Sequence, residues 1–377
     1  MRRAGVAGLL LTAGAAVAAA EPARMTVTAE GGAEMDSNVE RLELEAGRAT
    51  RAAPVARLGA KLVRTGRVAR GGYGLTAGAL ARTVLSGADS LSPENVVLLS
   101  GDARWMRPVG RRAVAVGIGL VAVDALPLTD PVGSRTFRTL AAEGLLALRG
   151  GAGRALAVAL GGRDFAYKPD PADRYDWRGP TASLRLDLTL WEQGEGARSL
   201  ELSALFGFEA RAYDSFANAS ACPEDAPPVR QCYTGTSLRR TDRFQRGGLE
   251  LTWTGRFVAA ASYQLSVTDS NSYGQSIVRH RVTLSATRNL PWRLYGTALA
   301  TLQLDNYPDG LPIDDLVTQS FTTLDDENRS SLQVRIARPL AAAWALEGRG
   351  AIWRDLGSDL DTEYRRALFY VGAVYTR

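Results

Sequence analysis

The chain of 377 residues has little of what enzymes and helical membrane proteins use. It holds one histidine and two cysteines, and after the N-terminal stretch it has no long apolar run. A transmembrane helix needs about 20 consecutive apolar residues. The formal net charge of +5 is too small and too dispersed to indicate nucleic-acid binding. Any part that crosses a membrane must therefore be made of β-strands.

A two-residue alternation of apolar and polar side chains is the main positive signal. From Thr181 to Leu190 the apolar residues take the even positions, and the polar residues, including Arg185 and Asp187, take the odd ones. One face of such a strand suits lipid and the other suits water. Charges face hydrocarbon only at high cost, so the pattern implies a lumen. The mean hydropathy of −0.10 is near neutral because the two faces cancel.

About sixteen such segments follow one another without a linker, which predicts one all-β domain. We expect a single antiparallel transmembrane β-barrel of about 16 strands, within a range of about 14 to 18, with both termini in the periplasm. The expected strands are 25–35, 55–64, 73–82, 96–105, 113–123, 137–146, 154–160, 181–190, 200–213, 248–254, 257–268, 278–287, 294–304, 332–337, 344–352 and 367–376. Short connections after even-numbered strands alternate with long ones, such as 36–54, 214–244 and 305–330. Bacterial barrels separate periplasmic turns from extracellular loops in this way.

The N-terminus carries the features of a secretion signal. Arg2 and Arg3 precede the apolar stretch 4–17, and Ala18 and Ala20 form an A-x-A site before Glu21. We predict a signal peptide over 1–20 and a mature barrel over 21–377, located in the outer membrane of a Gram-negative bacterium. A membrane anchor is the other reading, but the run is short for a span and ends in a cleavage pattern. No lipobox cysteine follows it.

Aromatic residues gather at the short-turn ends of the expected strands. Amphipathic rings prefer the membrane interface, so this set predicts a periplasmic aromatic girdle. Its members are Trp105, Trp191, Trp253, Trp292, Trp344 and Tyr375, joined by Phe257. Trp353, Tyr213 and Phe137 are candidates for the outer girdle.

The last strand carries the sequence Tyr370-x-Gly372-x-x-Tyr375. It resembles the terminal-strand signal that the bacterial barrel-assembly machinery recognises, which implies that machinery as a partner. The pattern departs from the usual one at the last position, where Arg377 replaces a terminal phenylalanine.

The first strand ends in Asp36-Ser37-Asn38-Val39. This segment resembles the one that opens a diverse set of proteobacterial outer-membrane barrels, among them surface-lipoprotein assembly modifiers. Those carry a helical-repeat domain for which this chain has no room, so their function is not transferred. Barrels associated with polysaccharide export resemble it in architecture only. The other reading of Asp36 to Asn38 is a turn former that starts a loop.

Cys222 and Cys232 both fall in the long connection 214–244. In a secreted protein, two cysteines in one polar loop predict a disulfide. Neither a metal site nor a cofactor is expected, because further ligands are missing nearby.

Enzyme readings find little support in the residues. His280 shares its parity with Val278 and Val282, so we expect it to face outward. Barrel phospholipases place a serine two residues after their histidine, where this chain has Val282. Omptin-like rim hydrolases need acidic pairs, and the connection 305–330 does supply Asp314, Asp315, Asp325, Asp326 and Glu327. A solvated acidic loop explains those acids as well. We expect no catalytic residues.

A barrel of this size is wide enough for an aqueous lumen, so a pore or export conduit for small solutes or a surface polymer is the main expectation. The alternative is a non-transporting scaffold or surface-binding barrel whose lumen is closed. The expected pore-lining residues are Arg57, Lys61, Arg104, Arg185, Asp187, Arg211, Arg279, Arg281, Arg335 and Arg349. Expected partners are outer-membrane lipid and lipopolysaccharide, and also periplasmic export components. Paired charges predict weak selectivity with a mild anion preference.

Overall fold

The computed structural model describes most of the chain. The described residues are 23–40, 44–45, 50–87, 91, 94–110, 113–129, 136–151, 153–167, 176–194, 197–221, 233–308, 329–356 and 362–377. The signal peptide predicted over 1–20, both cysteines, and the acidic stretch from Asp314 to Glu327 lie outside these residues.

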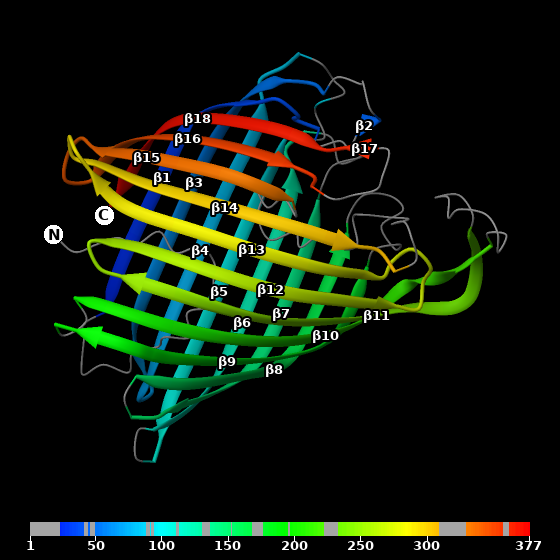
Figure 1. The fold of residues 1–377 in the computed structure, drawn as a ribbon, viewed down its shortest axis with the longest axis horizontal. Coiled ribbons are helices and arrows are strands. Elements are labelled where there is room, and N and C mark those ends of the chain that lie inside the picture. The colour runs from blue at the N-terminus through cyan, green and yellow to red at the C-terminus, as the bar shows by residue number, and fades with distance from the viewer. Residues whose placement is uncertain are drawn as a thin grey trace.

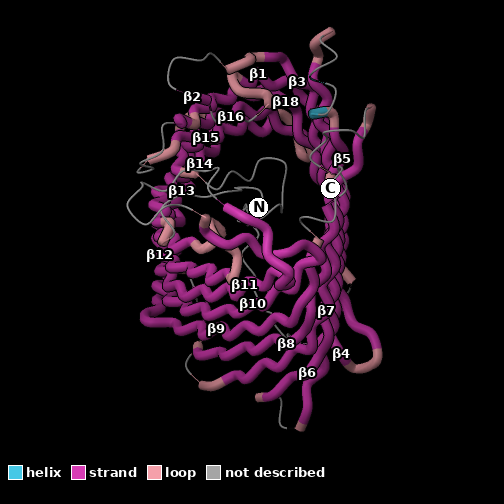
Figure 2. The backbone as a smooth tube through the Cα atoms, turned by 90° about the vertical axis from the view of Figure 1, so that its right-hand side faces the viewer, coloured by secondary structure: helices cyan, strands magenta, loops and turns pink. Residues whose placement is uncertain are grey.

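Sixteen antiparallel strands form one closed barrel, so the predicted all-β antiparallel barrel and its strand number are confirmed. Each strand pairs with its neighbour in the chain, and β1 closes the ring by pairing with β18 (Figures 1 and 2). The closing seam runs in register from Thr28 opposite Thr376 to Asp36 opposite Leu368. No helix in the described residues is long and apolar enough to span a membrane.

The strand bounds follow the predicted segments and mostly exceed them. The barrel strands are β1 (Arg24–Asp36), β3 (Ala53–Val68), β4 (Gly71–Val84), β5 (Val96–Val109), β6 (Val114–Pro127), β7 (Phe137–Arg149), β8 (Arg154–Tyr167), β9 (Trp177–Gln193), β10 (Arg198–Ser220), β11 (Tyr233–Thr254), β12 (Phe257–Ser270), β13 (Ile277–Leu290), β14 (Leu294–Asn306), β15 (Ser330–Pro339), β16 (Trp344–Arg354) and β18 (Arg365–Thr376). Two short strands, β2 (Leu44–Glu45) and β17 (Thr362–Glu363), pair with each other between two long connections.

The predicted alternation of connections is confirmed. Turns of two to four residues follow β3, β5, β7, β9, β11, β13 and β15, and connections of 6 to 23 residues join the other ends. We call these the turn end and the loop end. Both terminal strands end at the turn end, where the backbones of Val27 and Arg377 exchange two hydrogen bonds. The start of β1, the end of β18 and the short turns therefore share one rim.

The hairpin of β10 and β11 extends beyond the predicted strands and corrects the long loop expected over 214–244. β10 continues to Ser220 and β11 begins at Tyr233, so the hairpin projects past its neighbours (Figure 1). Alternation disappears here because both faces are polar, as in the run Arg239, Arg240, Thr241, Asp242 and Arg243. Pairing continues to Tyr233 through two register shifts.

Large apolar side chains cover the outer face of the barrel. Leu58, Ile118, Phe206 and Phe369 are 58–64% exposed, each on a different strand. Their chain neighbours on the opposite face are polar or small, such as Arg57, Gly119 and Gly207. The predicted two-faced strand is therefore the repeating unit of the wall.

Candidate functional site

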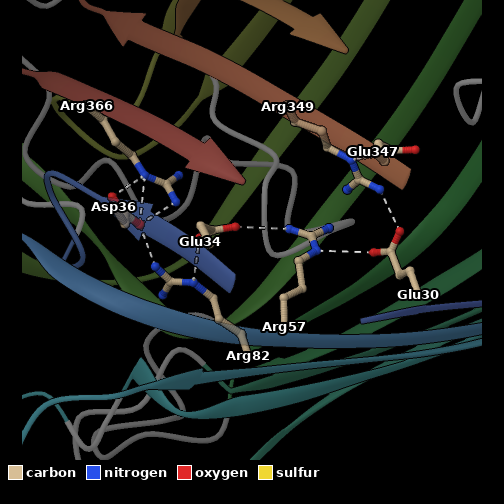
Figure 3. A network of polar contacts seen from close by, with 8 residues as sticks. All are labelled: Glu30, Glu34, Asp36, Arg57, Arg82, Glu347, Arg349 and Arg366. Atoms are coloured by element: carbon tan, nitrogen blue, oxygen red, sulfur yellow. Dashed lines mark hydrogen bonds and ion pairs between the residues drawn. The ribbon is translucent and has the colours of Figure 1, made fainter. Parts of the chain in front are cut away.

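The inner wall holds a continuous network of charges beside the closing seam (Figure 3). Its centre is Asp36, which is fully buried at the loop end of β1. The Arg366 guanidinium donates to both of its carboxylate oxygens, at 3.0 Å and 2.7 Å, and Arg82 donates at 2.5 Å. Because three strands meet at this carboxylate, it joins β18, β1 and β4.

The network continues along β1 toward the turn end. Glu34 lies between Arg82 and Arg57, with nitrogen–oxygen distances of 3.7 Å and 3.6 Å. Glu30 accepts from Arg57 at 3.2 Å and from Arg349 at 2.6 Å. The acids of β1 stand at every second or fourth position, so they share one face. Glu30 and Asp36 meet arginines from both sides of β1, whereas Glu34 meets Arg57 of β3 and Arg82 of β4 on one side.

Glu347 completes the network on β16. It pairs with Arg349 two residues along its own strand and with Arg335 on β15, and it is 1% exposed. At the other end Arg82 also contacts Glu94 at 3.5 Å. Every arginine of this network faces at least one carboxylate, which keeps these buried charges compensated.

A second charged cluster lies on β8 to β11. Arg211 pairs with Glu209 on its own strand, and Glu209 also meets Arg163 at 3.2 Å. The Arg211 guanidinium carbon lies 3.5 Å from the centre of the Phe244 ring and 4.2 Å from that of Trp177. Cation–π contact on both sides fixes this arginine against the wall.

Further pairs repeat the pattern around the ring. Asp187 accepts from Arg185 at 2.8 Å and from the Ser203 hydroxyl at 2.6 Å. Asp305 accepts two parallel bonds from Arg279, both of 2.8 Å. The other pairs are Arg104 with Asp102 at 3.1 Å and Arg240 with Asp242 at 2.7 Å. The described inner wall is therefore strongly charged but locally neutralised.

Apolar side chains collect on the inner face near the loop end. Val39 and Leu91, from two of the long connections, are 0% and 1% exposed and belong to one cluster with Val55 and Val84. Tyr364 from a third connection packs against Trp353 and its neighbours. Parts of these connections thus fold against the inner wall instead of standing outside it.

The structure brings most of the predicted lining residues onto this inner face. Arg57, Arg104, Arg185, Asp187, Arg211, Arg279, Arg335 and Arg349 are all in the ion pairs above. Register places Lys61 opposite Thr28 and Arg281 opposite Gln264, on the same face. That solutes meet these side chains remains a prediction.

Several inner-wall residues were missed. Arg82, Arg163, Arg240, Arg366, Glu30 and Glu34 share parity with lining residues of their strands, and that parity is a signal already present in the sequence. Asp36 was read as a turn former, and its Oδ1 does accept the Asn38 backbone N–H at 3.0 Å. It is also the buried centre of the network, a role that local sequence does not show.

The predicted girdle aromatics lie at the turn end. Trp191 stacks on Trp253 with ring centres 5.6 Å apart, and Trp344 meets Tyr375 at 5.1 Å. The Trp105 indole donates to the Val68 carbonyl at 3.1 Å. Trp292 stands in a turn at a φ of 58° and is 82% exposed. Whether a membrane interface surrounds them is part of the proposal below.

The candidates for an outer girdle were wrong. Trp353, Tyr213 and Phe137 are 2–4% exposed and lie on the inner face, where Phe137 stacks on Phe165 with ring centres 5.8 Å apart. Trp353 has the parity of Arg349, so alternation placed it inside, whereas its aromatic character suggested the interface. Parity decides because a side chain on a strand can reach only one face.

The proposed assembly signal divides between the two faces of β18. Tyr370 and Gly372 point inward, and Tyr375 points outward beside Trp344. The Tyr370 ring covers Gly32 of β1, because a Cβ on Gly32 would lie 2.7 Å from its Cε2 atom. Recognition by the assembly machinery remains a prediction.

His280 is exposed on the outer face, and its Nδ1 lies 2.9 Å from the Tyr263 hydroxyl. Register places it opposite Leu265 and Leu304, far from the inner-wall acids. The described residues thus pair this histidine with a phenol and not with a carboxylate or serine.

Comparisons with known proteins add little to this geometry. No protein-family model and no curated protein matches the chain. Among solved structures, a triple mutant of the porin of Rhodopseudomonas blastica is similar at 9% identity, covering 94% of this chain and 100% of that one, with a TM-score of 0.38. Pseudomonas putida OprB is similar at 8% identity, covering 94% of each chain, with a TM-score of 0.47. Scores this low carry no argument, so function must be inferred from the wall itself.

Proposed function

We propose that the chain is an outer-membrane pore, with the turn end in the periplasm and the loop end outside. The observation that supports this most is the pair of opposite faces on one closed barrel. Exposed large apolar side chains on so many strands would associate or aggregate in water. Hydrocarbon tolerates strands only where every backbone group is paired, and a closed barrel provides that.

The inner wall supports passive passage of small solutes with weak charge selectivity. A barrel of this strand number exceeds the size that side chains alone fill. The arginines and acids of the wall make the lumen polar enough to hold water, and their pairing reduces the net electric field that an ion meets. Export of a surface polymer is the narrower form of this proposal, and we place it second.

Single-channel recording in planar bilayers tests the proposal. We expect steps of conductance that persist in several salts and reversal potentials close to zero under a salt gradient. Before reconstitution, a shift in gel mobility between unheated and boiled samples checks that the barrel is folded. A folded, inserted barrel with no conductance in any salt contradicts the pore.

A closed scaffold is the second candidate, and one observation favours it. Val39, Leu91 and Tyr364 pack from long connections against the inner face near the loop end. Segments folded this way narrow the mouth. If Val39→Ser with Leu91→Ser opens a conductance that the intact chain lacks, the scaffold or gated form is favoured over the open pore.

A further inference from the structure

Exposed arginines gather around the turn end of the barrel. Six lie at strand ends on the outer face, and four lie in turns or at the C-terminus. We call this set the turn-end arginine ring: Arg64, Arg107, Arg154, Arg198, Arg288, Arg338, Arg70, Arg256, Arg293 and Arg377. The members come from strands all around the barrel, so the charge is not confined to one side.

These arginines differ from those of the inner wall in having no side-chain partner among the described residues. All ten are exposed, and none makes an ion pair or side-chain hydrogen bond with a residue that the structure describes. The inner-wall arginines Arg57 and Arg349 each contact two carboxylates, and Arg82 contacts three. Ten solvated cations on one rim need another source of negative charge nearby, or they repel one another.

Register shows that the six strand-end members point outward, away from the lumen. Arg64 is opposite Met25, which is 62% exposed, and Arg338 is opposite Leu346, which is 47% exposed. Arg288 is likewise opposite Phe257, which is 44% exposed. Directly opposed residues share a face, so these guanidiniums border the apolar band and not the pore.

Acidic side chains are missing from the same part of the outer face. The outward acids Asp124, Asp164 and Asp269 all lie near the loop end of their strands. Among the described residues near the ring, Glu192 of β9 is the one acid, and register places it opposite Ser199 on the inner face. Within the described part of the chain, a ligand outside the ring therefore meets outward arginines and no outward carboxylate side chain.

We propose that the turn-end arginine ring binds phosphate groups of anionic phospholipids in the leaflet that faces the periplasm. This inference rests on the proposed function, because it needs the barrel in a membrane. Trp105, Trp292 and Tyr375 of the aromatic girdle lie within two residues of Arg107, Arg293 and Arg377 along the chain. Such rings lie at the depth of the lipid headgroups. Arginine stems lie along the apolar edge while their charged ends reach the phosphates.

Lipid is a better ligand than a soluble anion because the strand-end arginines point away from the lumen. A solute entering the lumen meets the inner face, whereas six of these arginines stand on the other face. Phosphatidylglycerol suits the ring better than phosphatidylcholine, because its headgroup carries a net negative charge, whereas the choline cation is repelled by the arginines. An arginine close to an anionic surface raises the affinity for an anionic lipid over a neutral one by about fivefold.

Tryptophan quenching by brominated lipid measures this preference directly. The five girdle tryptophans all lie at the turn end, so they report lipid there. The full barrel is reconstituted in phosphatidylcholine vesicles with increasing brominated phosphatidylglycerol, or with brominated phosphatidylcholine. We expect the anionic lipid to quench with about fivefold higher apparent affinity, and about 0.5 M salt to reduce the difference.

Two matched variants locate the effect. Arg107→Gln, Arg288→Gln and Arg338→Gln together remove three of the six outward charges at the turn end and should lower the preference clearly below that of the intact protein. Arg178→Gln, Arg243→Gln and Arg354→Gln together remove three exposed arginines near the loop end and should leave the preference intact. Gel mobility before and after boiling checks that both variants fold.

The possible failures are distinguishable. If no brominated lipid quenches the tryptophans, the barrel is not in the membrane, and the proposed function fails with the ring. If both lipids quench equally in the intact protein, or if both triple variants lose the preference equally, the ring is not a lipid site while the pore remains. If the turn-end variant changes ion selectivity and not lipid preference, the ring serves the pore entrance instead.

Discussion

Asp36→Ala should be among the most destabilising single changes on the inner wall. Asp36 is 0% exposed and is the shared acceptor of Arg82 and Arg366, which are each 2% exposed. Its removal leaves two buried guanidiniums without their nearest countercharge. Breaking a buried ion pair in this way costs about 3 to 5 kcal/mol.

Asp187→Ala provides the matched comparison. Asp187 also pairs with an arginine on the inner wall, but its side chain is 33% exposed and that of Arg185 is 16% exposed. Water replaces part of the lost interaction, so the cost should stay below about 1 kcal/mol. Asp36→Asn separates charge from turn geometry, because it removes the negative charge and keeps one acceptor oxygen for the Asn38 backbone N–H.

Guanidinium unfolding in detergent micelles, followed by tryptophan fluorescence, measures these differences. We expect Asp36→Ala to lower the free energy of unfolding most, Asp36→Asn to lower it nearly as much, and Asp187→Ala to lower it little. Removing Arg366 together with Asp36 should cost less than the sum of the two single changes, by about 0.5 to 3 kcal/mol. Equal costs for Asp36→Ala and Asp187→Ala would refute the reasoning from burial.

Three further predictions test the faces, the seam and the lumen. Ala261→Arg puts a charge between exposed Leu251 and Leu284 on the outer face and should lower the free energy of unfolding by about 2 to 4 kcal/mol. The control Ser262→Arg places the charge opposite Glu250 on the inner face and should have a mild effect. Comparable unfolding curves for the two variants would contradict the assignment of the two faces. Gly32→Ala should reduce the heat-modifiable fraction on gels, because a Cβ there would lie 2.3 Å from the Val371 carbonyl oxygen. Gly74→Ala should leave that fraction unchanged, because a Cβ there would meet nothing within 4 Å. The same fraction for both variants would contradict tight packing at the closing seam. Arg279→Gln with Arg281→Gln frees the Asp305 carboxylate and should move the reversal potential toward cations in bilayer recordings; an unchanged potential would place these residues away from the ion path.

Most of the fold could be predicted because the two faces of each strand lie in opposite surroundings. Over Thr181 to Leu190 the alternation specifies strand, facing and approximate ends together. Alternation no longer predicts a strand where its two faces lie in the same surroundings. In the extension of β11, Arg239 and Arg243 point outward while Arg240 and Asp242 point inward, so both faces are polar and no period remains. Backbone pairing with β10, invisible in one sequence, sets those ends.

The candidate site could be predicted only in part, because some contacts follow from the strand period and others depend on how the barrel closes. Pairs such as Arg185 with Asp187 lie two positions apart on one strand, so their shared face and contact follow from the strand period alone. The contact of Glu30 with Arg349 joins residues 319 positions apart. It depends on how β1 meets β18 and β16 at closure, and that register is a property of the assembled ring.

These two kinds of pair have different consequences for selectivity. Five of the contacts join residues i and i+2 on one strand: Asp102 with Arg104, Arg185 with Asp187, Glu209 with Arg211, Arg240 with Asp242, and Glu347 with Arg349. Each pair forms a short dipole along its strand, and its field fades within about 8 to 10 Å at physiological salt. An ion near the middle of a wide lumen therefore senses little of them. Selectivity must then come from inner-wall charges that make no ion pair with a described residue, and Lys61, exposed and opposite Thr28, is one of them. Reversal potentials should consequently respond more to Lys61→Gln than to removal of an arginine and its paired acid together, such as Arg185→Gln with Asp187→Asn.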